Sequence, residues 1–249
     1  MVEAWLYTIL SVIVVSLISL IGVFTISIRK EILKEAICFL VSFAVGGLFG
    51  DVFLHLLPES FEKLGVGPSP SLLILFGILL FFGLEKFIRW RHCHDANCKE
   101  HSRPVSAMIL IGDGVHNFFD GILIAASYLI SIPLGIATAV AVILHEIPQE
   151  IGNFGVLLRG GFSINKALFF NFLSALTAIL GALISLIIGS RLAAYSSFLL
   201  PITAGGFIYI AGSDLIPELH HEIRPLASFR QFTAIILGIG LMFLLTFLD

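Results

Sequence analysis

Charged residues are scarce in this chain of 249 residues: Asp, Glu, Lys and Arg make up 12% of it, whereas hydrophobic residues make up 58%. A typical soluble domain carries about 25% charged residues. Since a water-soluble globule could not hide so large an apolar share, the composition excludes a soluble enzyme and most nucleic-acid binders. The net charge of −3 favours no partner of either sign, and we expect no nucleic acid partner.

Cysteine is scarce as well, with three residues, Cys38, Cys93 and Cys98. Three thiols cannot form a disulfide framework, so we expect no covalent cross-links to hold the fold together. The sequence also contains no G-x-x-x-x-G-K-[ST] phosphate-binding loop, which excludes direct use of ATP through that motif.

Long apolar runs fill most of the chain instead. One crossing of a bilayer needs about 20 apolar residues in a helix. We therefore predict an all-α integral membrane protein, a single polytopic domain over residues 1–249 with eight transmembrane helices. The predicted spans lie near residues 4–28, 35–57, 71–90, 105–129, 133–158, 166–189, 197–219 and 229–248.

Positive charge is distributed unevenly over the predicted loops. One side of the membrane would hold twelve of the Lys and Arg residues, and the other side only Lys63 and Arg191. Because positive residues stay in the cytoplasm, we expect both termini outside it and the loop 91–104 inside it. The expected location is the cell membrane, plasma or inner.

Two segments repeat one pattern: GGLFGDVFLHLLPE at 46–59 and GGFIYIAGSDLIPE at 205–218. The two copies would cross the membrane in opposite directions, as in transporters built from inverted repeats. We interpret the pattern as an inverted repeat; chance similarity of two apolar helices is the alternative.

Two of the predicted spans are rich in polar residues. The span 105–129 contains Asp113, His116, Asn117 and Asp120, and the span 133–158 contains His145, Glu146, Gln149, Glu150 and Asn153. The four carboxylates would together cost about 10 kcal/mol if they were uncompensated in the bilayer. A cation is the natural compensation, and ionisable groups at this depth indicate a functional path.

Helical spacing predicts how these side chains meet. Asp113, His116 and Asp120 share one face of their helix by i, i+3 and i+7 spacing, and His145 and Gln149 form an i, i+4 pair. Imidazole nitrogen with carboxylate and amide oxygen suits Zn²⁺ and neighbouring divalent metals better than Cu(I). Pro148 is expected to kink the second helix and to free the carbonyl of Leu144.

At HNFFDG (116–121) and HEIPQE (145–150) the sequence resembles the ZIP family of divalent-metal transporters. The resemblance continues through GDVFLHLLPES, NFLSALTAILGALI and AGGFIYIAGSDLIPEL and so covers nearly the whole membrane portion. It implies eight helices in an inverted 3+2+3 arrangement, a homodimer, no organic cofactor, and import of Zn²⁺ by alternating access. Fe²⁺, Mn²⁺ and Cd²⁺ are further substrates that the resemblance leaves open.

The resemblance also implies ligand sets. An inner metal site would use His116, Asp120, His145 and Gln149, and an adjacent second site would use Asn117, Asp120, Glu146 and Gln149. Gln149 stands where the family signature has His or Glu, and Asn153 stands where the related pattern often has Asp. Both differences lower the local negative charge, and Glu150 is a further candidate ligand that would partly substitute.

Polar residues also flank the predicted site. Asp51 and His55 form an i, i+4 pair at the predicted outer end of the second span, and Asp214 and Glu218 lie at the inner end of the seventh. We interpret them, together with Asp113, as a transport pathway; for the flanking residues, interfacial positions facing lipid headgroups are the alternative. The segment 91–101 concentrates metal-ligating residues, which predicts a cytoplasmic metal-binding loop or, alternatively, a plain solvated loop. These residues are His92, Cys93, His94, Asp95, Cys98 and His101.

Two other functions compete with transport. HEIPQ partly matches the H-E-x-x-H motif of zinc hydrolases, with Glu146 as general base. That motif needs a second His at position 149, where this chain has Gln. A metal sensor that never moves its ion is the other alternative. We therefore predict a transporter and not an enzyme.

Overall fold

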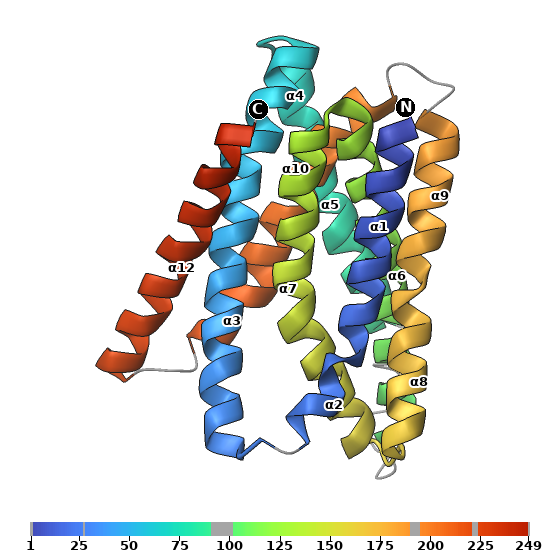
Figure 1. The fold of residues 1–249 in the computed structure, drawn as a ribbon, viewed down its shortest axis with the longest axis vertical. Coiled ribbons are helices and arrows are strands. Elements are labelled where there is room, and N and C mark those ends of the chain that lie inside the picture. The colour runs from blue at the N-terminus through green and yellow to red at the C-terminus, as the bar shows by residue number, and fades with distance from the viewer. Residues whose placement is uncertain (1, 27, 91–101, 190–194, 221–223, 249) are drawn as a thin grey trace.

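The computed structural model describes residues 2–26, 28–90, 102–189, 195–220 and 224–248, and within these residues every regular element is a helix. Figure 1 shows them side by side in one bundle, with the N- and C-terminal ends at the same end of it. The helices are α1 (Val2–Ile18), α2 (Gly22–Thr25), α3 (Lys30–Asp51), α4 (Leu57–Leu64), α5 (Pro68–Trp90), α6 (Ser102–Ile130), α7 (Ile132–Arg159), α8 (Ile164–Ala175), α9 (Thr177–Gly189), α10 (Tyr195–Tyr209), α11 (Ile216–Leu219) and α12 (Pro225–Leu245). Short 3₁₀ turns join α1 to α2 (η1, Ser19–Ile21) and follow α12 (η4, Thr246–Leu248).

Among the described residues, seven helical stretches are long and apolar enough to cross a membrane: Val2–Thr25, Glu35–Leu64, Pro68–Lys86, Ile132–Leu158, Ile164–Gly189, Tyr195–Ser213 and Pro225–Leu245. Helix α6 lies among them as the eighth long helix, and it carries the buried Asp113 and Asp120. The chain is therefore an all-helical membrane protein, as the long apolar runs predict.

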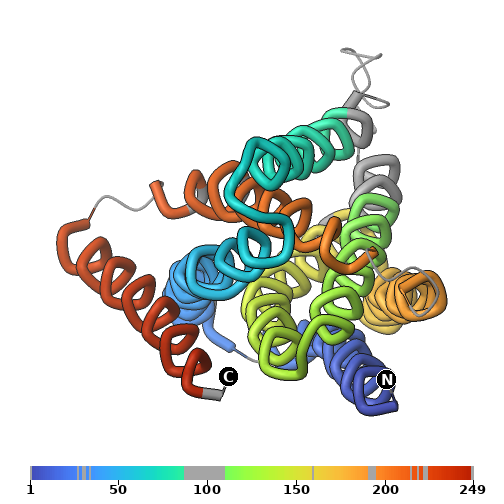
Figure 2. Tube along the Cα trace, turned by 90° about the horizontal axis from the view of Figure 1, so that it is seen from above, coloured from blue at the N-terminus to red at the C-terminus, as the bar shows by residue number. Residues whose placement is uncertain are grey.

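Viewed from above, the helices fall into two groups (Figure 2). The first, the α6–α7 group, contains α1 and α2, α6, α7, and α8 with α9; the second, the α3–α10 group, contains α3, α4, α5, α10, α11 and α12. The two groups meet where α3 contacts α7 and where α10 contacts α6. The polar face of α7 therefore lies close to the centre of the bundle.

Glycines allow the closest helix crossings inside each group. A Cβ added to Gly121 of α6 would lie 1.9 Å from the carbonyl oxygen of Ala178, and one on Gly181 of α9 would lie 1.9 Å from the oxygen of Phe118. In the other group, a Cβ on Gly205 of α10 would lie 2.1 Å from the oxygen of Ile74. Only glycine allows backbones to approach so closely at these positions.

The two repeated segments have the same irregularity. The helix that begins with α3 passes through a π-helical segment, η2 (Val52–Leu56), and the helix that begins with α10 passes through another, η3 (Ile210–Leu215). Each ends just ahead of the proline of the repeat, Pro58 or Pro217, which cannot donate a backbone hydrogen bond. The π-helical turns therefore coincide with the missing donors, at the same register of both copies.

Helix boundaries differ from the expected spans mainly near these turns. The stretch expected to end near residue 57 continues through η2 into α4 and ends at Leu64, because a proline is well tolerated in the first turn of the new helix. Helix α7 runs through Pro148 without a break, and its start is capped by Ser131, whose hydroxyl accepts a hydrogen bond from the Leu134 amide at 3.2 Å.

Candidate metal centre

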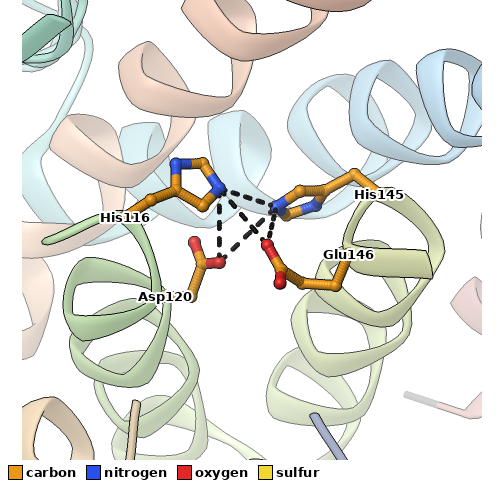
Figure 3. A group of neighbouring side chains, drawn as sticks. All are labelled: His116, Asp120, His145 and Glu146. Atoms are coloured by element: carbon orange, nitrogen blue, oxygen red, sulfur yellow. Dashed lines mark hydrogen bonds and ion pairs between the residues drawn. The ribbon is translucent and has the colours of Figure 1, made fainter. Parts of the chain in front are cut away.

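Two histidines face each other in the middle of the bundle. His116 lies on α6 and His145 on α7, and their Nε2 atoms are 3.2 Å apart (Figure 3). The Nδ1 of His145 donates to the carbonyl oxygen of Ala141 at 3.1 Å, one turn earlier on the same helix. That bond assigns the proton to Nδ1 and leaves the Nε2 lone pair directed at His116, which is how metal-binding histidines are usually oriented.

Two carboxylates complete this cluster. An oxygen of Asp120 lies 3.5 Å from the Nε2 of His116 and 3.5 Å from that of His145. An oxygen of Glu146 lies 3.5 and 3.6 Å from the same two atoms. Three of these side chains have no exposed surface and His116 is 18% exposed, so the group forms a buried set of two nitrogen and two oxygen ligands.

A second group of carboxylates lies beside the first. Oxygens of Asp113, Glu146 and Glu150 approach within 4.8 Å of one another, and all three residues are buried. Neither carboxylate oxygen of Glu150 has a hydrogen-bond partner among the described residues. Within the same part of the chain, no Lys or Arg forms an ion pair with either group, and their negative charge needs another cation.

The structure distributes the expected ligands differently from the resemblance. The amide nitrogen of Gln149 donates to the Oδ1 of Asp113 at 3.4 Å, and the carboxylate of Glu146 stands beside the two imidazoles. The amide of Asn117 donates to the backbone oxygen of Asp113 at 3.2 Å. Gln149 lies four residues after His145, so its side chain can point to either side of that face of α7. The buried carboxylate of Asp113 attracts the amide of Gln149.

Helix α8 contributes residues that the sequence analysis missed. The hydroxyl of Ser174 donates to the Oδ2 of Asp113 at 2.6 Å, and the amide of Asn171 donates to the backbone oxygen of Glu150 at 3.4 Å. Both residues belong to the NFLSAL segment, where a buried Asn and Ser interrupt an apolar helix. The polar interruption of this apolar helix is the sequence signal that could have identified these two residues as part of the site.

The structure describes some of the predicted pathway and loop residues and not others. Asp51 and His55 are both buried, with the Nδ1 of His55 3.4 Å from an oxygen of Asp51; His55 lies on the π-helical segment η2 and Asp51 lies just before it. The backbones of Asp214 and Glu218 lie in η3 and α11, but their side chains lie outside the described residues. His92, Cys93, His94, Cys98 and His101 also lie outside them.

A buried cluster of imidazole and carboxylate between two membrane helices, with no Lys or Arg paired with it in the described part of the chain, defines a class of protein: a membrane protein that handles divalent metal ions. The sequence model of the family described as "ZIP Zinc transporter" matches residues 2–107 and 90–246. The chain belongs to the ZIP zinc transporter family.

Individual relatives agree with this assignment. The chain is 32% identical to the "Zinc transporter ZIP13 homolog" of Drosophila melanogaster, over 98% of this chain and 89% of the relative. It is 36% identical to "Zinc transporter ZIP13" of Pongo abelii, over 82% of this chain and 65% of the relative, and 28% identical to "Metal cation symporter ZIP14" of Xenopus tropicalis, over 98% and 70%. The family places the chain among transporters and not among enzymes.

Proposed function

We propose that the protein imports Zn²⁺ into the cytoplasm through the cluster of His116, Asp120, His145 and Glu146. The observation that carries this proposal is the spacing of the four ligand atoms. A tetrahedral zinc ion with bonds of about 2.0–2.2 Å needs ligand atoms about 3.3–3.6 Å apart. The contacts between the two imidazoles and the two carboxylates measure 3.2–3.6 Å.

The charge of the cluster supports the same conclusion. Two ionised carboxylates, Asp120 and Glu146, balance one divalent cation, and the two imidazoles bind as neutral ligands. The mixture of nitrogen and oxygen ligands also suits Fe²⁺, Mn²⁺ and Cd²⁺, which we include as secondary substrates. Glu146 and Glu150, which lie beside Asp113, are the candidate ligands of a second ion, because their carboxylate oxygens have no hydrogen-bond partner within the described residues.

The route through the membrane follows from the repeat. Asp51 and His55 lie on one repeated segment, and Asp214 and Glu218 lie on the other. We propose that the first pair lies on the outer approach to the cluster and the second pair on the inner exit. The proposal also includes a single membrane domain over residues 1–249, assembly as a homodimer, and the loop 91–104 as a cytoplasmic metal-binding segment.

Membrane potential supplies a driving force for import. A potential of 100 mV, negative inside, favours entry of a divalent cation by about 4.6 kcal/mol. Zinc uptake into proteoliposomes is therefore expected to be saturable and to accelerate when such a potential is imposed. The measurement compares Zn²⁺, Fe²⁺, Mn²⁺ and Cd²⁺ with and without potential. Stoichiometric binding without flux would favour a sensor, and metal-dependent cleavage of peptide or lipid would favour a hydrolase.

The orientation has its own test. Because twelve of the Lys and Arg residues lie on one side of the predicted topology, epitope tags at both termini are expected to bind antibody on intact cells without permeabilisation. A tag inserted in the loop 91–104 serves as the internal control and should bind only after permeabilisation. A terminus that reacts only in permeabilised cells contradicts the assignment.

A further inference from the structure

Asp113 has an unusual environment for a carboxylate beside a metal cluster. Its Oδ1 accepts hydrogen bonds from two side-chain amides of α7, Asn153 at 2.7 Å and Gln149 at 3.4 Å. Its Oδ2 accepts one from the hydroxyl of Ser174 on α8 at 2.6 Å. All three donors are neutral, so they satisfy the carboxylate as an anion without cancelling its charge.

These bonds tie three helices together next to the cluster. Asp113 precedes His116 on α6 by three residues, which is about one turn, and Asn153 follows His145 on α7 by eight residues, or about 12 Å along the helix. We call these three hydrogen bonds to Asp113, from Asn153, Gln149 and Ser174, the clamp. The clamp fixes how far α6 and α7 are shifted along each other. That shift determines whether His116 and His145 meet at the correct distance for one ion.

The same bonds determine the position of Gln149. Its amide points to Asp113, whereas the carboxylate of Glu146 lies beside both imidazoles. Released from Asp113, the oxygen of Gln149 could enter the cluster as an additional neutral ligand. More oxygen ligands and a higher coordination number suit Mn²⁺ better than tetrahedral Zn²⁺.

We infer that Asp113, held by Asn153 and Ser174, is a positioning residue that sets the zinc affinity and the zinc-over-manganese preference of the cluster. This inference rests on the proposed function, since it assigns specificity to the same site. It also explains why positions 149 and 153 both carry an amide, which can donate a hydrogen bond to the Oδ1 of Asp113. An ionised carboxylate at position 153 would have no proton to donate to that oxygen.

Exchanging the side chains of Asp113 and Asn153, in two steps, tests the inference. Asp113→Asn removes the negative charge and leaves one acceptor oxygen where the carboxylate has two, and it is expected to raise the KM for Zn²⁺ about tenfold and to raise manganese uptake relative to zinc. Adding Asn153→Asp recreates an amide–carboxylate pair with the roles exchanged. The double variant is expected to return the zinc KM and the metal preference to within about threefold of the unmodified protein.

Several outcomes would overturn the inference. If the KM for Zn²⁺ is unchanged in Asp113→Asn, the clamp does not act on the cluster. If the double variant is folded but its zinc KM and metal preference are not restored, the carboxylate is needed at position 113 itself, as a ligand. If Asp113→Asn does not accumulate, Ser174→Ala and Asn153→Ala remove single donors and should each raise the KM; unchanged values contradict the inference.

Equilibrium binding of Zn²⁺ to the purified variants separates this inference from the proposed function. Should His116→Ala still transport zinc, the proposed pathway fails. The affinities of the Asp113→Asn and double variants still report whether the clamp acts on a metal site. Should His116→Ala stop transport while the swap restores nothing, only the clamp fails.

Discussion

Replacing His116 or His145 with Ala is expected to reduce zinc uptake at least about 100-fold. Loss of an outer partner of a metal ligand typically costs 10–100-fold, and loss of a ligand itself should cost more. Each substitution also leaves Asp120 and Glu146 as buried carboxylates with one imidazole fewer to share an ion. The measurement is initial zinc uptake per molecule of transporter in proteoliposomes.

Thr233→Ala is the control for this pair. Thr233 is exposed on α12, and its hydroxyl donates to the backbone oxygen of Phe229 on the same helix at 2.9 Å, so its removal should leave uptake unchanged. If both histidine variants retain the uptake rate and KM of the unmodified protein, zinc does not pass through the cluster and the proposed pathway is wrong.

The second large effect is expected from the crossing of α6 and α9. The added methyl group in Gly121→Ala would lie 1.9 Å from the carbonyl oxygen of Ala178, and in Gly181→Ala it would lie 1.9 Å from that of Phe118. Backbone atoms cannot give way like a flexible side chain, so the helices must separate, at a cost of about 3 kcal/mol or more. The thermal midpoint of the purified protein in detergent should fall clearly, and zinc uptake with it, because α6 carries His116 and Asp120.

Other glycines of this chain provide matched controls. Apart from its own helix backbone, a Cβ on Gly83 of α5 or on Gly240 of α12 would meet no atom of the described residues within 4 Å. Ala at those positions should leave the midpoint unchanged or raise it, since Ala favours a helix over Gly by about 1 kcal/mol. If Gly121→Ala behaves like Gly83→Ala, the close approach of α6 to α9 does not limit stability.

Helical periodicity predicted the part of the site that lies along single helices. The spacing of His116 and Asp120 on α6, and the position of His145 on α7, predicted two polar faces that meet, and in the structure the two imidazole Nε2 atoms lie 3.2 Å apart. The long apolar runs likewise predicted an all-helical membrane fold. The first signal depends on residues within about two helical turns of one another and the second on continuous runs of about 20 residues, and a single sequence displays both directly.

Partners on different helices could not be predicted in this way. Ser174 lies 61 residues beyond Asp113, and nothing in their spacing shows that they form a hydrogen bond. The direction of Gln149 was equally hidden, because its choice between the histidines and Asp113 depends on how α6 and α7 are shifted along each other. The π-helical turns η2 and η3 follow from prolines that the repeat does contain, but a proline alone does not specify which irregular turn forms.

The close helix contacts at glycines can form at different times while the chain is being synthesised. Gly121 and Ala178 are 57 residues apart, so the contact of α6 with α9 can form early. A Cβ on Gly238 of α12 would lie 2.7 Å from the backbone nitrogen of Gly47, yet positions 47 and 238 are 191 residues apart. At about 5–20 residues per second, α3 waits about 10–40 s in the membrane before α12 reaches it. During that interval the face of α3 that α12 will cover is open to lipid or to a neighbouring chain.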